Sequence, residues 1–281
     1  MLRASRDLQA MIVAARRAGV GLMRRFRSRD RLVVELKGPA DFVSVADRES
    51  EDLLRAILLR RYPGHGFLTE ESAPTEGRRA DTRFVVDPLD GTTNFLHGIP
   101  HFAVAIALEH EGRVVAGVVH DPAKDETFVA ELGAGAWLGP RRLRVADDRD
   151  FSRALVGTGI PHSSSRARHA RYLSVLSRVM KEAAGIRRLS AAALDLSYVA
   201  AGRFAVFFEL GLKPWDVTAG SLLVQEAGGT VTQPDGRDGF LSSGDILATN
   251  GRLHPQMLAM FRRPSRRVAS ARQPRRTSPR G

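Results

Sequence analysis

The spacing of apolar residues changes along the chain, and this change constrains the fold more than any other feature. Residues 4–27 place apolar side chains at helical intervals opposite a row of arginines, and a second helix is expected from Asp47 to about Tyr62. Residues 67–145 instead contain short β-type runs separated by Gly, Pro and Asp, which predicts a mostly antiparallel sheet. Beyond residue 150, helical and β-type segments alternate. We therefore predict layers of helix and sheet in two halves.

Three segments follow from this pattern. Residues 1–145 would hold the N-terminal helices and the sheet, residues 146–261 a C-terminal α/β half, and residues 262–281 a disordered basic tail. In the first half a strand is expected at 32–36, followed by a loop at Lys37–Pro39. In the second half strands are expected at 154–159, 204–208 and 246–250, and helices at 167–183, 191–201, 215–227 and from 253 onward.

The net charge of +12 over 281 residues is unevenly distributed. Residues 262–281 hold eight arginines and no acid, which leaves +4 for residues 1–261. Only four of the 43 basic residues are lysines, a skew that genome composition can produce without selection for phosphate contacts. Nucleic acid is expected to bind only through the basic tail, and the arginine-faced first helix is the next candidate surface.

Other features exclude whole classes of protein. No apolar run approaches the length of a membrane span and the N-terminus is no signal peptide, so a soluble, cytoplasmic protein without membrane contact is expected. The absence of cysteine excludes disulfides, zinc-thiolate sites and thiol nucleophiles. No two of the eight histidines have metal-site spacing. Any metal would be held by oxygen or imidazole.

The densest chemical signal is the segment Asp87-Pro88-Leu89-Asp90-Gly91-Thr92-Thr93. An apolar strand delivers Asp87 to its end, and Asp90-Gly91 makes a turn whose backbone can approach a ligand closely. If a helix begins at Thr92, the amides of Gly91 to Thr93 are free to bind an anion. A plain turn with Thr92 as a helix cap would explain the segment alone, and the acids elsewhere favour a ligand site.

Further acids lie at comparable positions. Glu70-Glu71 follows another strand, where alternate side chains face opposite ways, so one glutamate would face the site. Asp216 lies in the first turn of an expected helix, where helix capping would account for it by itself. Gathered in one pocket, Glu70, Asp87, Asp90 and Asp216 would repel each other and any phosphate. Oxygen-only ligands favour Mg²⁺, and about two or three such ions would make the pocket attractive to a phosphate.

Together these motifs carry a family resemblance. Glu70-Glu71-Ser72, the segment from Asp87 to Phe95, Trp215-Asp216-Val217-Thr218-Ala219-Gly220 and Glu226-Ala227-Gly228-Gly229 resemble the signatures of the inositol monophosphatase family of Mg²⁺-dependent, lithium-sensitive sugar phosphatases. Order and spacing match over about residues 30–260. The segments 38–42 and 98–103 are more similar to the bacterial inositol-1-monophosphatase branch. The resemblance implies an α+β fold layered as αβαβα, in a phosphoric monoester hydrolase whose members are commonly homodimers.

The resemblance also implies roles for individual residues. The metal ligands would be Glu70, Asp87, the carbonyl of Leu89, Asp90 and Asp216. Catalysis would involve Thr92, hydrogen-bonded to Asp47, and Glu70, with Lys37 in the layer of residues around the ligands. The substrate would be bound by Gly91, Thr92, Thr93, Ala192, Glu209 and Asp216, of which Glu209 would accept hydrogen bonds from ring hydroxyls.

The chain departs from the family pattern at the substrate wall. Ser190-Ala191 stands where Gly-Ser or Gly-Thr is usual, and Gly202-Arg203-Phe204-Ala205 where Gly-Arg-x-Asp is common. The metal ligands are intact, so phosphatase activity is a stronger inference than inositol specificity. Inositol-1-phosphate is the expected substrate, and the alternatives are fructose-1,6-bisphosphate, histidinol phosphate and 3′-phosphoadenosine 5′-phosphate. An alternative of another class is a nucleic-acid-binding protein that retains the fold.

Overall fold

The structure is a computed structural model of the 281-residue chain. It describes residues 4–28, 34–38, 41–79, 81–161 and 166–262, and for residues 34–38 and 41–44 it describes the backbone alone. All statements below concern these residues.

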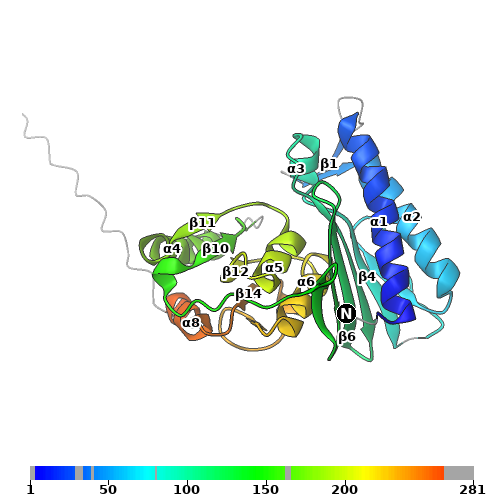
Figure 1. Cartoon of the computed structure of the whole chain (residues 1–281). Coiled ribbons are helices and arrows are strands. Elements are labelled where there is room, and N and C mark those ends of the chain that lie inside the picture. Colours follow the sequence, from blue (N-terminus) through cyan, green and yellow to red (C-terminus); the bar gives the residue numbers. More distant parts are fainter. Residues whose placement is uncertain (1–3, 29–33, 39–40, 80, 162–165, 263–281) are drawn as a thin grey trace, which may run out of the picture.

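The first half of the chain forms two helices and a large sheet (Figure 1). The helices are α1 (Arg6–Arg27) and α2 (Val45–Arg61), with a small antiparallel pair, β1 (Val34–Gly38) and β2 (Asp41–Ser44), between them in the chain. The large sheet has the order β3-β4-β5-β6-β7-β8-β9. Its strands are β3 (Gly66–Thr69), β4 (Thr82–Asp90), β5 (Ala103–His110), β6 (Arg113–Asp121), β7 (Glu126–Glu131), β8 (Gly135–Leu138) and β9 (Arg141–Arg142), with the short helix α3 (Thr92–Leu96) after β4.

The second half forms a five-stranded sheet of order β11-β10-β12-β14-β13. Its strands are β10 (Leu155–Thr158), β11 (Gly185–Arg187), β12 (Val206–Glu209), β13 (Thr230–Thr232) and β14 (Ile246–Thr249). The helices are α4 (Arg166–Glu182), α5 (Ala192–Ala200), α6 (Pro214–Glu226), α7 (Phe240–Ser243) and α8 (His254–Arg262), preceded by a 3₁₀ turn at Phe151–Arg153.

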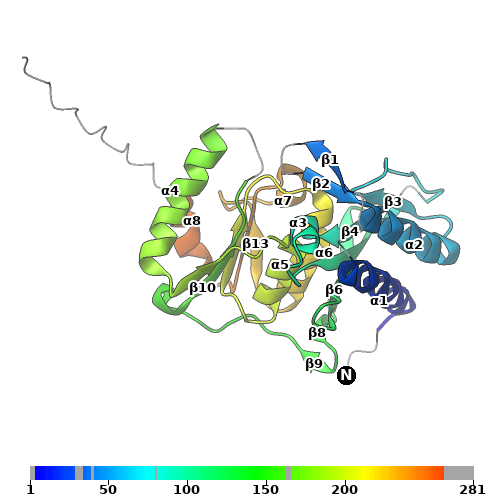
Figure 2. The same ribbon diagram turned by 90° about the horizontal axis from the view of Figure 1, so that it is seen from above.

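The elements stack in five layers. Alternate side chains of β4 face opposite sides of the sheet: Phe84 and Val86 pack with α1 and α2, whereas Val85 packs with α5 and α6. The smaller sheet repeats this division, because Phe207 packs toward α5 and α6, while Phe208 packs toward α4 and α8. Helices α5 and α6 therefore lie between the two sheets (Figures 1 and 2). This confirms the expected α+β fold with αβαβα layers.

The large sheet is antiparallel except at one edge, where β3 runs parallel to β4. One local prediction was wrong: Lys37 and Gly38 were expected in a loop but belong to β1, because the strand continues into its antiparallel pairing with β2. The strands β11 and β13 were not expected from the sequence. Each is three residues long and is held as a strand by pairing with its neighbour.

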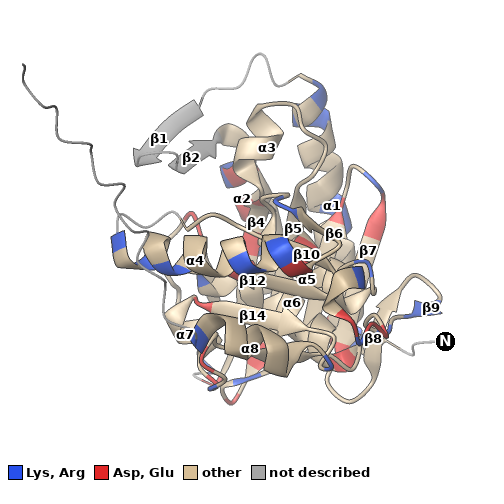
Figure 3. Cartoon of the chain, turned by 90° about the vertical axis from the view of Figure 1, so that its left-hand side faces the viewer, with Lys and Arg blue, Asp and Glu red and all other residues tan. Residues whose placement is uncertain are grey.

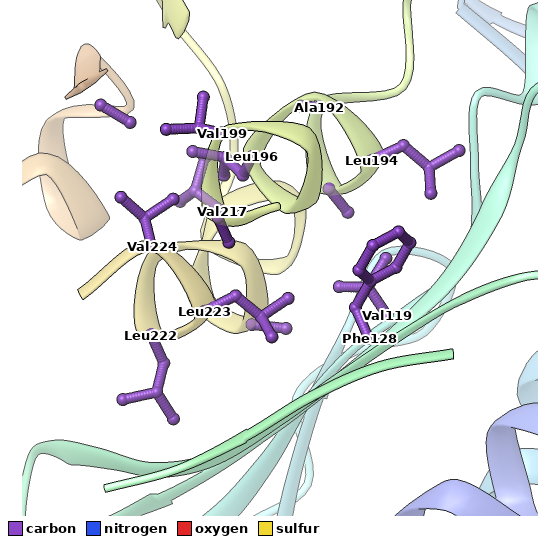
Figure 4. Packing of buried hydrophobic residues seen from close by; sticks show 14 of the residues in the cluster. Val119, Phe128, Ala192, Leu194, Leu196, Val199, Val217, Leu222, Leu223 and Val224 are labelled. Atoms are coloured by element: carbon purple, nitrogen blue, oxygen red, sulfur yellow. The ribbon is translucent and has the colours of Figure 1, made fainter. Parts of the chain in front are cut away.

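Glycine allows α5 and α6 to approach closely between the sheets. A Cβ atom at Gly220 in α6 would lie 2.6 Å from Cβ of Leu196 in α5. Around this contact Leu194, Leu196, Val217, Leu223 and Phe128 pack as a continuous apolar cluster (Figure 4). The position of α6 matters for the site because this helix carries Asp216 in its first turn.

We expect Gly220→Ala to lower the free energy of unfolding by about 1–3 kcal/mol, since its methyl group would overlap Leu196. The matched control is Gly21→Ala in α1, where a Cβ atom meets nothing within 4 Å. That change should stabilise the protein by roughly 0.5–1 kcal/mol through helix propensity. Denaturant unfolding of both variants measures the difference, and equal effects would contradict the close helix contact.

Candidate active site

The central feature of the site is a bulge where β4 ends. Asp87 pairs with Ala105 of β5, and the next pairing joins Asp90 to Ala103, so β4 has one extra residue between them. Pro88 has no amide hydrogen to donate to the ladder, which suits this position. The Leu89 amide donates instead to Oδ1 of Asp87 at 3.0 Å. The bulge thereby places two buried carboxylates at one end of the sheet.

Asp90 connects this strand end to a helix of the other half. Its Oδ1 accepts from the Ala192 amide at 3.2 Å and its Oδ2 from the Ala193 amide at 2.8 Å. These amides belong to the N-terminus of α5, whose N-cap residue Ala191 has no side chain that could accept them. Asp90 therefore caps α5 from a distant part of the sequence.

The Thr92 hydroxyl lies between two acceptors. It is 3.0 Å from Oδ1 of Asp47 and 3.0 Å from the Leu89 carbonyl oxygen. Asp47 is fully buried in the first turn of α2. The preceding residue, Gly91, has φ +89°, and a Cβ atom there would lie 3.1 Å from the His101 carbonyl oxygen. Only glycine fits this backbone without strain.

The other two predicted ligands come from either side of β4. Asp216 accepts from the Lys213 amide at 2.7 Å through Oδ2, so it does cap α6. Its charge also raises the pKa of Asp87 and that of Asp90, so it faces the same region. Glu70 follows β3 and is half-buried. Among neighbouring charges, that of Glu70 raises the pKa of Asp87 the most. The structure brings Glu70, Asp87, Asp90 and Asp216 together.

Burial and neighbouring negative charges raise the pKa values of these acids. Burial first, and then the charges of Glu70, Asp90 and Asp216, raise the pKa of Asp87 well above its ordinary value. Burial and Asp216 raise the pKa of Asp90 to about 7, against the amides of α5, which lower it. Burial raises the pKa of Asp216 to about 6. Burial and mutual repulsion therefore oppose ionisation of these acids, and nearby positive charge would favour it.

Glu209 ends β12 on the other side of this region. Its carboxylate lies directly over Gly159, where a Cβ atom would come within 2.0 Å of the Glu209 Cδ atom. Burial, Asp216 and Asp90 raise the pKa of Glu209 to about 8, while Arg188 lowers it. Glu209 therefore belongs electrostatically to the same cluster as the four carboxylates.

The remaining predicted residues differ in what they offer. Thr93 is exposed, and Leu89 accepts the Thr92 hydroxyl through its carbonyl. The amide of Ala192 already donates to Asp90, so Ala192 would contact a ligand through its methyl group. The side chain of Lys37 lies outside the described residues.

Several residues that support the site were not identified from the sequence. Ser50 donates to the Pro88 carbonyl at 2.8 Å, and buried Glu51 accepts from Thr69 at 2.9 Å and from the Glu71 amide. Asn94 donates to the carbonyls of His101 and Leu189. Ser50 and Glu51 follow Asp47 by three and four residues, so helical spacing places them on the same face of the helix as Asp47. The sequence could therefore have indicated these two residues. No signal in the sequence indicates Asn94.

A different acidic group lies at the opposite end of β4. Donor atoms of the exposed residues Asp81, His110 and Glu111 all lie within 4.8 Å of one another, an arrangement that could bind a metal. Among the described residues, no three of the predicted ligands meet this spacing.

A model of the inositol monophosphatase family matches residues 4–265. The chain belongs to the inositol monophosphatase family. It is 49% identical over 257 residues to an inositol-1-monophosphatase of Mesorhizobium japonicum, covering 92% of this chain and 96% of that protein. It is 42% identical over 255 residues to the Nus factor SuhB of Escherichia coli, covering 91% and 95%. The crystal structure of the extragenic suppressor protein SuhB of Bartonella henselae has a TM-score of 0.89 at 46% identity, covering 92% of this chain and 99% of that one.

Membership of this family supports phosphatase activity on a small phosphate ester, and the family is metal-dependent. The chemistry of the described site agrees with such a group. Its donors are carboxylate and carbonyl oxygens, which hard divalent cations prefer. The uncompensated repulsion among Asp87, Asp90 and Asp216 is what a cation would relieve. None of the described helices has the length and apolarity to cross a bilayer.

Metal binding should stabilise the protein in a pH-dependent way. Asp90 and Asp216 have pKa values of about 7 and about 6 in the folded state, above the ordinary 3.8. Stability of the metal-free protein is therefore lost as the pH rises from about 4 to 7, because the folded chain keeps protons that the unfolded chain releases. A divalent cation takes the place of these protons.

We expect the cation to raise the melting temperature more at about pH 8 than at about pH 5, where protons compete with it. Thermal unfolding with and without the cation at both values measures this. An equal increase at both would argue against cation binding by these carboxylates.

Proposed function

We propose that this protein hydrolyses a small phosphate monoester with Mg²⁺, and that its substrate is inositol-1-phosphate, which yields inositol and phosphate. The observation that carries the proposal is the convergence of Glu70, Asp87, Asp90 and Asp216 beside the hydrogen-bonded pair of Thr92 and Asp47. The relative named inositol-1-monophosphatase supports the choice of substrate.

The residues divide the reaction between them. Bound Mg²⁺ would supply positive charge to the phosphate and make a water acidic; Glu70, Asp87, Asp90, Asp216 and the Leu89 carbonyl would hold it. Because the Thr92 hydroxyl donates to Asp47 or to the Leu89 carbonyl, its oxygen remains able to accept a hydrogen bond from the attacking water. Thr92 and Glu70 would orient this water. Its oxygen would bond to phosphorus as the ester P–O bond breaks, and the proton that the water loses would balance the proton taken up by the leaving oxygen.

The substrate would lie between residues 91–93 on one side and Glu209 and Ala192 on the other. The amides of Gly91 and Thr92, with Thr93 beside them, would bind the phosphate. Glu209 would accept hydrogen bonds from ring hydroxyls, and Ala192 would contact the ring. We also propose a cytoplasmic homodimer that is inhibited by lithium. Lys37 would belong to the layer of residues that surrounds the metal ligands.

The first test is phosphate release from a panel of sugar, polyol and nucleotide monophosphates, with and without Mg²⁺. We expect inositol-1-phosphate to be the best substrate and Mg²⁺ to be required. Asp87→Asn should lower turnover by about two orders of magnitude or more. The same change should raise the melting temperature of the metal-free protein, because it removes a crowded charge while an amide oxygen can still accept from Leu89. Full activity of Asp87→Asn would refute the ligand assignment.

A second test concerns the attacking water. Thr92→Ala keeps the backbone amide for the phosphate but loses the hydroxyl, so kcat should fall by about 10²–10⁴-fold while KM changes little. The control is Thr92→Ser, which retains a hydroxyl for Asp47 and should retain most of the activity. A variant that loses only affinity would instead make Thr92 a binding residue.

Nucleic-acid binding is a second candidate function. Relatives named Nus factor SuhB suggest it, and the charge of this chain favours it. Helix α4 carries Arg166, Arg168, Arg171, Arg178 and Lys181, visible along its length in Figure 3. It packs against α8, after which the chain continues into a segment with seven further arginines.

Ending the chain at Arg262 tests this candidate. Phosphatase activity and thermal stability should not change, because every proposed site residue precedes Arg262. Any binding of RNA should be independent of sequence and should weaken steeply with salt, since arginine contacts to phosphate release counterions. The truncated chain should lose most of it in a filter-binding assay. Salt-resistant, sequence-selective binding by the truncated chain would place the function on the folded surface.

A further inference from the structure

Asp195 is a buried acid for which the proposed reaction has no use. It lies in the first turn of α5 with 1% of its surface exposed. Neither carboxyl oxygen has a hydrogen-bond partner among the described residues. An acid at this position ordinarily accepts from free helix amides, but in α5 the amides of Ala192 and Ala193 donate to Asp90. Helix capping therefore does not account for Asp195.

A second buried carboxyl group lies in the same region. Glu209 is 7% exposed. Helix α5 packs on β12, which Glu209 ends. Among neighbouring charges, that of Glu209 raises the pKa of Asp195 the most, after the effect of burial. Two buried carboxyl groups thus lie on neighbouring elements, and the unpaired oxygens of Asp195 carry a cost.

A single proton would allow the two carboxyl groups to pair with each other. A protonated carboxyl group has one O–H to donate, and an ionised one accepts. The proton belongs on Asp195, the more deeply buried of the two, and the charge on Glu209, nearer to solvent. This order agrees with the pKa of Asp195, which burial and then the charges of Glu209 and Asp90 raise well above its ordinary value.

The surrounding charges favour the same order. Asp216 and Asp90 raise the pKa of Glu209 to about 8 in addition to burial, and Arg188 lowers it. Arg188 acts on Asp195 in the same direction. On the outer side of the sheet, burial and then the charge of Glu209 raise the pKa of Tyr172. Cations bound at Asp90 and Asp216 would favour ionisation of Glu209 before that of Asp195.

We propose that Asp195 is a positioning residue that acts through Glu209: it stays a neutral carboxylic acid, and its O–H orients the Glu209 carboxylate toward hydroxyl groups of the substrate. The inference rests on the proposed role of Glu209 in substrate binding. It identifies the preferred substrates as phosphate esters of polyols, because only a hydroxyl-bearing leaving group benefits from an oriented, ionised acceptor.

Two variants of the full-length chain, assayed with Mg²⁺, test the donor. Asp195→Ala removes it, and Asp195→Asn replaces it with an amide N–H. We expect Asp195→Ala to lower kcat/KM for inositol-1-phosphate about tenfold relative to kcat/KM for phenyl phosphate, which has no hydroxyl groups. Asp195→Asn should restore most of this ratio. Equal losses on both substrates, or no rescue by asparagine, would overturn the proposal.

Two further measurements separate positioning from a structural role. In the wild type, KM for inositol-1-phosphate should rise once the pH is high enough to ionise Asp195, and this rise should be absent in Asp195→Asn. With saturating Mg²⁺ to replace the protons of Asp87, Asp90 and Asp216, the infrared C=O band of a neutral carboxylic acid should be present near neutral pH, lost in Asp195→Asn and retained in Glu209→Gln. A wild type without this band would refute a neutral Asp195. If the wild type releases phosphate from neither substrate, the proposed function fails while the infrared test of Asp195 still stands.

Discussion

The hydrogen bonds between Asp90 and the N-terminus of α5 are the contact on which the rest of the site depends. They join the bulge of β4 to a helix more than 100 residues later in the chain. The helix end has no polar cap of its own, and its partial positive charge favours a carboxylate. Through Leu196 and Gly220, α5 in turn determines where α6 lies. Asp90 and Asp216 are therefore brought together by packing between the sheets.

This arrangement concentrates negative charge where the fold supplies little to balance it. Asp87, Asp90, Asp216, Glu209 and Asp195 all have raised pKa values, and burial is the first cause for each. A structure that gathers repelling acids in its interior has given up stability there, which is common where a protein binds a cation or carries out chemistry. The acids divide into those that a cation would compensate and a pair, Asp195 and Glu209, that a single proton would compensate.

Much of this site could be predicted because its central residues are contiguous. The segment from Asp87 to Thr93 indicates a strand end, a turn and a helix start without any knowledge of tertiary contacts. Asp216 was ambiguous, since an acid in a first helical turn is explained by capping; in the structure it caps α6, and its charge also raises the pKa of Asp90. The strands β11 and β13 are too short to show a period, so only their pairing partners reveal them.

The sequence by itself determined the local elements and the chemistry available to them, because apolar period, turn residues and carboxylate spacing act over a few neighbouring residues. It determined the layered fold class and, through its motifs, the family. Only the tertiary structure decided which groups share a dielectric environment. Asp195 reads in the sequence as an ordinary acid in a helix, and its burial without a partner beside Glu209 arises from the packing of α5 on β12. Desolvation and charge coupling depend on distance in space, and the chain does not encode that distance until it has folded.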